Sequence, residues 1–152
     1  MTEDERFMAC AMDLAREAAR DGDEPFGAVL VKGGAILAAG KNRIHTHSDP
    51  TYHAEIGLVR DYCAASGKAD LSDCTLYSSC EPCFMCAGAV VWAKLGRLVF
   101  GAYDSDYCAI RGFAPNECSS LIFNLSPVAP KVTGGVLREE AVRILREDFG
   151  KP

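Results

Sequence analysis

The chain has 152 residues, of which 49% are hydrophobic and 24% are charged, as expected for one globular domain with a substantial buried core. No run of about 18 apolar residues is present, so no membrane-spanning helix is expected, and the acidic N-terminus lacks a secretory signal, which indicates a cytoplasmic protein. The net charge of −5 weighs against a general nucleic-acid binder without excluding a local basic patch.

The N-terminal part of the chain predicts a helix followed by a hairpin. Between residues 3 and 20, small and apolar side chains recur at helical spacing among charged ones. The apolar run FGAVLV at 26–31 is typical of a buried strand. After the turn signal Gly33-Gly34, the run AILAAG at 35–40 supplies a returning strand. The two strands are therefore expected to pair antiparallel.

The middle of the chain predicts a loop and then alternating helices and strands. Residues 41–51 are polar and read as a loop, and HAEIGLVRDYCAAS at 53–66 reads as a helix. A strand is expected at 74–79, where β-forming residues gather. A second helix is expected at 83–94, with Pro82 in its first turn, where the missing N–H of proline costs nothing.

The C-terminal part predicts one more strand and a final helix. RLVFGAY at 97–103 reads as a strand, and residues 137–149 read as a helix. Between them, residues 104–135 contain turn residues that interrupt any long element, so an irregular segment is expected. The element order predicts an α/β protein in which helices are layered on a mixed sheet, with residues 1–152 forming a single domain.

Three cysteines recur at every third position: Cys80, Cys83 and Cys86. In a reducing compartment such cysteines are thiols or metal ligands rather than disulfides. Cys83 and Cys86 would share one face of the first helical turn, so both can bind the same ion. Cys80 differs, because Glu81 precedes a proline and is biased to extended backbone. We therefore expect Cys80 at the end of the preceding strand, beside the pocket but not on the metal.

A histidine at another predicted helix start completes a ligand set. A neutral imidazole such as that of His53 suits zinc, and together with Cys83 and Cys86 it gives three protein ligands. Three ligands leave the fourth tetrahedral position open, which is the arrangement of a catalytic zinc. Glu55 lies two residues after His53. It is the candidate carboxylate that accepts the proton of an activated water molecule.

Other metal sites fit parts of the same pattern. The same residues could belong to a structural zinc site or be coincidental buried thiols. An iron–sulfur cluster could use Cys80, Cys83 and Cys86 if Cys108 supplied the fourth thiolate. An as-purified absorbance spectrum separates zinc from the cluster, because zinc proteins are colourless.

Beyond the metal ligands, the whole chain resembles a known family. The sequence H-x-E followed by P-C-x-x-C is the signature of the zinc-dependent cytidine deaminase-like superfamily. The stretches that resemble the branch of guanine deaminases, fungal-type cytosine deaminases and tRNA adenosine deaminases are PFGAVLV, GKNRI, DPTYHAEI, TLYSSCEPCFMCAGA and GRLVFGAYD. The resemblance implies a three-layer α/β/α sandwich around a central mixed sheet of roughly five strands.

The resemblance also implies residue roles. One zinc ion per chain would be bound by His53, Cys83 and Cys86, and Glu55 would be the catalytic proton shuttle. The substrate contacts that it implies are the side chain of Asn42, the backbone N–H groups of Ala54 and Cys83, the backbone carbonyl of Glu81 and a pocket wall that includes Phe26.

Three further residues are candidates by position alone. Asp104 and Tyr107 follow a predicted strand end and could reach the substrate, with a solvated loop as the alternative. Phe149 ends the last predicted helix and could cap the pocket, with core packing as the alternative.

The implied activity is that of a hydrolase acting on C–N bonds of cyclic amidines. The expected substrate is a free nucleobase or related small heteroaromatic amine, of guanine, cytosine or amino-triazine type, with release of ammonia. The alternatives are a tRNA adenosine-to-inosine deaminase, a guanosine or cytidine deaminase, and a zinc-stabilised interaction module without activity. An intact Glu55 and an open fourth zinc position argue against the last.

Partners are predicted from charge and from the resemblance. Basic and acidic residues balance from Arg138 onward, so this tail offers no net attraction to phosphate. The segment after FGAYD also departs from the lysine-bearing loop of tRNA deaminases. A small nucleobase-like molecule is therefore the expected partner, in preference to nucleic acid, and no membrane partner is expected. The resemblance implies a homodimer.

Overall fold

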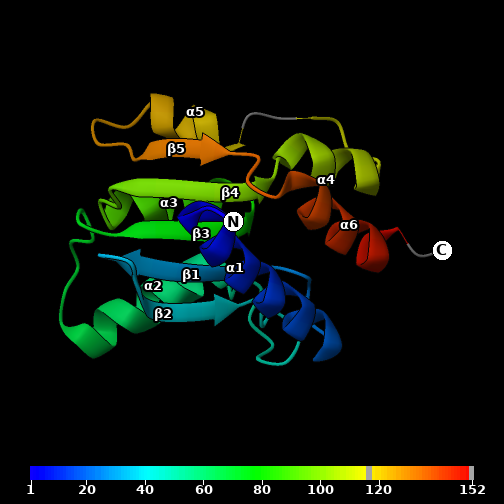
Figure 1. Ribbon diagram of the computed structural model, residues 1–152, viewed down its shortest axis with the longest axis horizontal. Coiled ribbons are helices and arrows are strands. Elements are labelled where there is room, and N and C mark those ends of the chain that lie inside the picture. The colour runs from blue at the N-terminus through cyan, green and yellow to red at the C-terminus, as the bar shows by residue number, and fades with distance from the viewer. Residues whose placement is uncertain (116–117, 151–152) are drawn as a thin grey trace.

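The computed structural model describes residues 1–115 and 118–150, and its centre is a five-stranded sheet (Figure 1). The strands are β1 Gly27–Lys32, β2 Ala35–Lys41, β3 Thr75–Cys80, β4 Arg97–Ala102 and β5 Lys131–Gly134. They lie in the order β2-β1-β3-β4-β5. Strand β1 runs antiparallel to β2 and β3, whereas β3, β4 and β5 run parallel to one another. The sheet is therefore mixed, as the sequence predicts.

Helices cover both faces of this sheet. In the described part of the chain they are α1 Glu3–Arg20, α2 Ala54–Ser66, α3 Phe84–Trp92, α4 Asp104–Arg111, α5 Cys118–Asn124 and α6 Arg138–Phe149. Helices α1 and α6 pack on one face, and α2, α3 and α5 pack on the other. In Figure 1, α1 crosses in front of the strands and α2 and α3 lie behind them. This arrangement confirms the predicted three-layer sandwich. None of the helices described has both the length and the apolar character needed to cross a membrane.

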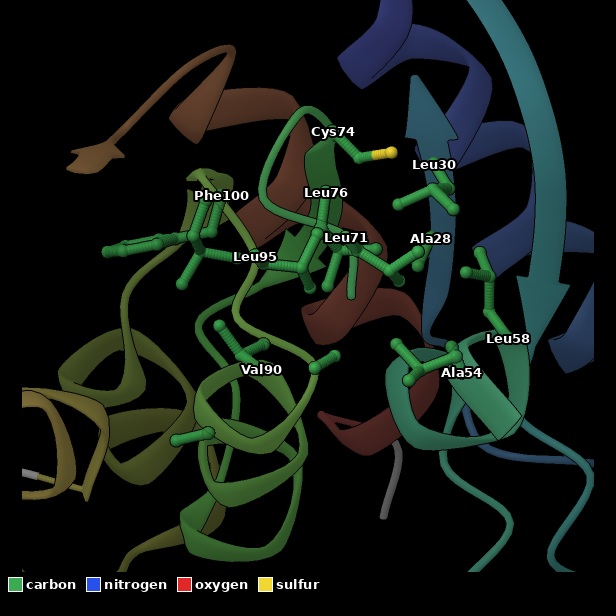
Figure 2. Close-up of a cluster of buried hydrophobic side chains, with 14 of the residues drawn as sticks. Ala28, Leu30, Ala54, Leu58, Leu71, Cys74, Leu76, Val90, Leu95 and Phe100 are labelled. Carbon is green, nitrogen blue, oxygen red and sulfur yellow. The ribbon is translucent and has the colours of Figure 1, made fainter. Parts of the chain in front are cut away.

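Strand β1 contributes to both hydrophobic cores. Ala28 and Leu30 belong to the core on the side of α2 and α3, where Figure 2 shows them in one cluster with Ala54 and Leu58. Val29, between them in sequence, belongs to the core under α1 and α6. Because successive strand side chains point to opposite faces, a strand buried on both faces is apolar throughout.

Helix α1 has the bounds that its periodicity predicts. Its N-cap, Thr2, accepts a hydrogen bond from the backbone N–H of Glu5 at 3.1 Å, which satisfies one of the unpaired donors of the first turn. The buried side chains recur at helical spacing and are Phe7, Met8, Ala11, Met12, Ala15 and Ala18. This stripe holds α1 against β1 and β3.

The expectation that residues 104–135 are irregular is wrong. This segment contains α4, α5 and the edge strand β5. Helix α4 has only eight residues, with a backbone N–H of Tyr103 donating to Asp106 at its start and Gly112 at φ 74° after its end. Strand β5 has four residues. Elements of this length are too short for a clear periodicity, so tertiary packing rather than local pattern determines them.

Gly27 is required by the close approach of β1 to α1. A Cβ atom at this position would lie 2.2 Å from the backbone oxygen of Ala11 and 2.6 Å from the backbone nitrogen of Ala15, neither of which can move aside easily. We expect Gly27→Ala to lower the free energy of unfolding by about 1–3 kcal/mol or more, as overpacking does. Urea denaturation followed by circular dichroism measures this effect.

Gly88 supplies a matched control within α3. A Cβ atom there meets nothing within 4 Å. Since alanine is the better helix former by about 0.5–1 kcal/mol, Gly88→Ala should leave stability unchanged or raise it slightly. Equal effects of the two substitutions would contradict the packing argument.

Candidate functional site

The metal-ligand candidates lie at the starts of two neighbouring helices. His53 is the N-cap of α2 and Cys83 is the N-cap of α3, both in extended backbone conformation. Cys86 lies in the first turn of α3. The prediction that Cys83 and Pro82 lie inside the helix is therefore wrong, because α3 begins at Phe84. A capping residue has non-helical backbone angles, yet it remains close to the third helical residue, so Cys83 and Cys86 still face the same point.

The three side chains meet in space. One nitrogen of His53 and the sulfur atoms of Cys83 and Cys86 all lie within 4.8 Å of one another. His53 Nδ1 is 3.5 Å from Cys83 Sγ. Within residues 1–115 and 118–150, no other group of three or more histidine, cysteine or acidic side chains is placed to hold a metal ion. Cys80 and Cys108 stand outside the group.

The chemistry of these donors fits zinc. Imidazole nitrogen and thiolate sulfur are preferred zinc ligands, and tetrahedral bonds of about 2.0 and 2.3 Å place such atoms about 3.5 Å apart. The 3.5 Å separation of His53 Nδ1 and Cys83 Sγ agrees with that geometry. A set of three protein ligands leaves a position for water or substrate, as in catalytic sites.

The electrostatic environment of the site favours the thiolate form of Cys83. A hydrogen bond with Cys86 is the main cause that lowers the pKa of Cys83 to about 4. The pKa of His53 is raised by its hydrogen bond with Cys83. The pKa of Cys86 is raised by its own hydrogen bond with Cys83 and by burial. Cys83 is therefore a thiolate at neutral pH, which is the form in which cysteine binds metals.

Glu55 is a buried carboxyl group beside the ligands. It lies in the first turn of α2, and only 6% of its surface is exposed. Burial raises the pKa of Glu55 to about 7, because desolvation disfavours the charged form. A carboxyl group with this pKa can accept and donate protons near neutral pH. Glu55 is not part of the group of ligand atoms.

A pocket opens at these residues. Its lining consists of Glu24, Phe26, His53, Glu55, Cys80, Glu81, Cys83, Asp104 and Tyr107. The structure thus brings together most of the site residues expected from the sequence. Four expected residues do not line the pocket: Asn42, Ala54, Cys86 and Phe149. Glu24 was missed, because a single acidic residue before Pro25 belongs to no motif.

Asn42 lies directly behind Glu24. It is 1% exposed, and its Oδ1 accepts hydrogen bonds from the backbone N–H groups of Glu24 at 3.3 Å and Ile44 at 3.1 Å. Its Nδ2 is the only buried side-chain nitrogen or oxygen in the described residues that has no hydrogen-bond partner. A buried donor without a partner costs free energy, so it indicates a ligand that accepts this bond.

Aromatic rings form one wall of the pocket. Phe26 and Tyr107 line it, with ring centroids 6.0 Å apart. Phe149 packs against both rings from behind, at 6.0 and 5.6 Å. The guanidinium group of Arg111 lies 4.5 Å from the ring of Phe149. Phe149 therefore supports the wall and does not contribute to its surface, in contrast to the expected cap.

Glu81 joins the pocket to two helices. One carboxylate oxygen accepts a hydrogen bond from the backbone N–H of Asp104 at 3.0 Å, and the other accepts from the hydroxyl of Ser119. The carboxylate of Asp104 in turn accepts a hydrogen bond from the thiol of Cys108 at 3.4 Å. Burial raises the pKa of Asp104. The turn before α3 is thus held against the starts of α4 and α5.

Cys80 lies at the end of β3, as its position before Glu81-Pro82 predicts. It is buried, lines the pocket and stands outside the metal-ligand group. Burial raises the pKa of its thiol. The exclusion of Cys80 from the ligand group rests on its position at the end of β3. The side chain of Cys118 lies outside the described residues.

Comparison with known proteins finds deaminases. Residues 1–102 match the family model of the cytidine and deoxycytidylate deaminase zinc-binding region. Guanine deaminase from Bacillus subtilis (strain 168) is 47% identical over 103 residues, which cover 67% of this chain and 66% of that protein. The tRNA-specific adenosine deaminase from Agrobacterium fabrum (strain C58) is 37% identical over 153 residues, covering 98% of this chain and 95% of that protein.

Solved structures give the same result. Guanine deaminase from Nitrosomonas europaea superposes with a TM-score of 0.84 at 31% identity, covering 97% of this chain and 85% of that one. An NE0047 mutant in complex with 8-azaguanine superposes with a TM-score of 0.87 at 32% identity, covering 97% and 86%.

The alignment covers 66% of the Bacillus guanine deaminase. Other relatives are much longer than this chain, which spans 26% and 24% of the tRNA(Ile)-lysidine synthases from Deinococcus deserti and Deinococcus radiodurans. The region that matches the family model, residues 1–102, carries His53, Glu55, Cys83 and Cys86. The chain therefore belongs to the family defined by the cytidine and deoxycytidylate deaminase zinc-binding region.

Proposed function

We propose that this chain is a zinc-dependent hydrolase that removes the amino group of a free nucleobase or related small heteroaromatic amine, of guanine, cytosine or amino-triazine type. The observation that carries the proposal is the meeting of His53, Cys83 and Cys86 at a pocket that also contains the buried carboxyl group of Glu55. A ligand set for one zinc ion and a proton carrier in one pocket support hydrolysis of the C–N bond of a cyclic amidine.

The chemistry divides between the metal and Glu55. When bound, the zinc ion supplies a Lewis acid that makes water nucleophilic at neutral pH. Glu55 accepts a proton from the attacking water and passes it to the ring nitrogen, while a C–O bond forms at the amino-bearing carbon. Glu55 then carries the second proton of that water from the new hydroxyl group to the amino group. The C–N bond breaks, ammonia leaves and the hydroxyl oxygen becomes a carbonyl group of the ring.

The pocket residues orient the ring. The unpartnered Nδ2 of Asn42 donates to an acceptor of the substrate, and the rings of Phe26 and Tyr107 flank its planar body. The remaining proposed contacts are the backbone N–H groups of Ala54 and Cys83, the backbone carbonyl of Glu81 and the side chain of Asp104.

The charge of the pocket favours a substrate without phosphate. Among the described lining residues, Glu24, Glu55, Glu81 and Asp104 are acidic and none is lysine or arginine. Like charges repel strongly where water is partly excluded. We therefore expect free bases to be accepted and nucleoside monophosphates to be rejected.

A tRNA adenosine deaminase is the second candidate function. The observation that favours it is the 37% identity to the Agrobacterium tRNA-specific enzyme, which extends over 95% of that protein. Helix α6 carries both acidic and basic side chains in its end turns, so it offers phosphate no uniformly basic surface. A guanosine or cytidine deaminase remains the third candidate.

We also propose one deaminase domain over residues 1–152, present as a homodimer. Exposed apolar side chains on and beside two neighbouring helices support a self-associating face: Phe84 and Trp92 on α3, Leu121 on α5, and Leu125 directly after α5. Trp92 is 87% exposed, which is unusual for a tryptophan on an isolated surface. Light scattering that gives the mass of a single chain would contradict the dimer.

An ammonia-release screen tests the proposed function. The substrates are guanine, cytosine, adenine, amino-triazines, the corresponding nucleosides and monophosphates, and an anticodon stem-loop RNA. We expect release from at least one free base and none from the monophosphates. Zinc content measured on the same preparation should be one ion per chain. Inosine formation in the RNA with no release from any free base would replace this function by the second candidate.

A further inference from the structure

Glu24 lines the pocket but has no role in the chemistry above. It lies in the segment between α1 and β1, immediately before Pro25 and Phe26, and is partly buried. Its carboxylate makes no hydrogen bond or ion pair within residues 1–115 and 118–150. A carboxylate that is partly removed from water and has no partner is expected to gain one from a ligand.

The other acidic side chains of the pocket differ from Glu24. The carboxylate of Glu81 accepts hydrogen bonds from the backbone N–H of Asp104 and the hydroxyl of Ser119. The carboxylate of Asp104 accepts a hydrogen bond from the thiol of Cys108. Glu55 is the proton carrier. These three groups therefore have internal tasks, whereas Glu24 faces the pocket with both oxygens available to accept hydrogen bonds.

The backbone of Glu24 is fixed although its carboxylate is unpaired. Its N–H donates to Oδ1 of Asn42 at 3.3 Å, and its carbonyl accepts from the N–H of Phe26 at 2.9 Å. Because the backbone is already ordered, a ligand of Glu24 has to fix only the side-chain torsions.

Glu24 and Asn42 carry complementary groups: Glu24 lines the pocket, and Nδ2 of Asn42 is buried next to the backbone of Glu24. The unpartnered Nδ2 of Asn42 is a donor, and the carboxylate of Glu24 is an acceptor. The two residues are neighbours, because the backbone N–H of Glu24 donates to Oδ1 of Asn42. A heteroaromatic ring that carries an N–H next to a carbonyl or ring nitrogen matches this pair. A ring alkylated or ribosylated at that nitrogen would leave the carboxylate unpaired.

We propose that Glu24 is a specificity-determining residue that accepts a hydrogen bond from a ring N–H of the substrate while Asn42 donates to an adjacent acceptor of the same ring. This inference rests on the proposed function and deepens it, because it selects unsubstituted free bases over their N-substituted derivatives. The acceptor is anionic, so the bond should be among the stronger ones in the site.

A binding measurement tests this role independently of turnover. The probes are 8-azaguanine and the free base most active in the screen, titrated into the zinc-loaded protein by calorimetry. Glu24→Ala should weaken binding by about 10- to 100-fold, the effect of losing a hydrogen bond to a charged group. Glu24→Gln should weaken it by a smaller factor, because its amide oxygen still accepts a hydrogen bond but carries no charge. The KM of the Glu24→Ala protein should rise by the same factor as its dissociation constant, while kcat and zinc content stay close to those of the unchanged protein.

Glu139→Gln is the matched control. It makes the same change of charge at an exposed position in the first turn of α6, outside the pocket lining. It should leave binding, KM and zinc content unchanged. A protein with Glu24→Ala that binds the base as tightly as the Glu139→Gln protein would overturn the role of Glu24.

A substrate series separates recognition from a merely structural effect. The N-methyl derivative at each ring N–H of the active base is compared with the parent base, in the unchanged protein and in Glu24→Ala. In the unchanged protein one methylation should weaken binding at least about tenfold, and in Glu24→Ala the same methylation should cost much less. Equal penalties in both proteins would refute the contact.

The two levels of the proposal fail in different ways. If the unchanged protein releases no ammonia and binds no base, the proposed function fails, and the role of Glu24 fails with it. If the unchanged protein does both and Glu24→Ala retains full affinity, only the role of Glu24 is wrong.

Discussion

A protein with Glu55→Gln is expected to keep its zinc and to lose about 10²- to 10⁴-fold in kcat, the usual contribution of a general acid–base group. Glutamine has the shape of glutamate but cannot carry a proton between water, ring nitrogen and leaving amine. The burial that raises the pKa of Glu55 to about 7 is what suits the native carboxyl group to both transfers. Steady-state kinetics on the active base and zinc content by atomic emission measure the two quantities.

The combination of the two measurements makes this experiment decisive. Loss of zinc in Glu55→Gln would place this residue among the ligands instead. Turnover close to that of the unchanged protein would reject Glu55 as the proton carrier. The Glu139→Gln protein serves again as a control, because it carries the same amide replacement at an exposed site.

The second large effect concerns the regularly spaced cysteines. Cys83→Ser or Cys86→Ser is expected to reduce zinc affinity by more than about 100-fold, since even residues that only support a ligand contribute about 10- to 100-fold. Cys80→Ser should retain its zinc, because Cys80 stands outside the group that includes His53. Dialysis against a chelator of known affinity, followed by zinc analysis, distinguishes the three proteins.

The same three proteins test the rival metal site. An iron–sulfur cluster would need Cys80 and a fourth thiolate such as Cys108, whose sulfur donates to Asp104 instead. Zinc retained in Cys83→Ser together with zinc lost in Cys80→Ser would favour ligation by Cys80. A coloured protein as purified would point to the cluster. Circular dichroism of each variant excludes loss of the fold as the cause.

Sequence periodicity predicted the elements whose pattern is long enough to repeat. Helix α1 completes several turns with a buried stripe from Phe7 to Ala18, and its observed bounds are the predicted ones. Strand β5 has four residues and α5 has seven, so neither offers enough repeats to be recognised. Their positions depend on partners far away in sequence, such as Arg97 opposite Lys131 in the sheet.

The candidate site divides in the same way. His53, Glu55, Cys83 and Cys86 fall in short motifs, and the structure brings them together, while their chemical roles stay predictions. The equal spacing of Cys80, Cys83 and Cys86 has no common structural meaning, because the first ends a strand, the second caps a helix and the third lies inside it. Helical spacing places side chains on one face only within one helix.

Glu24 shows what no local pattern could reveal. Its carboxylate reaches the pocket because β1 pairs with β3, which brings the segment before β1 beside the turn that carries Glu81 and Cys83. A single acidic residue before a proline has many possible surroundings. Only the tertiary fold selects one of them.

Glu81 lines the pocket and accepts a hydrogen bond from Ser119, so a shift of α5 would move a side chain of the pocket wall. Ser119 holds the start of α5 against the turn before Cys83, while Leu121 on the same helix and Leu125 directly after it are exposed. Any molecule that binds this exposed surface with a preference for one position of α5 therefore biases the pocket as well. Thermodynamic reciprocity then requires that substrate binding change the affinity of the exposed surface by the same factor. If the proposed homodimer forms through this surface, the carboxylate of Glu81 would link self-association to substrate affinity.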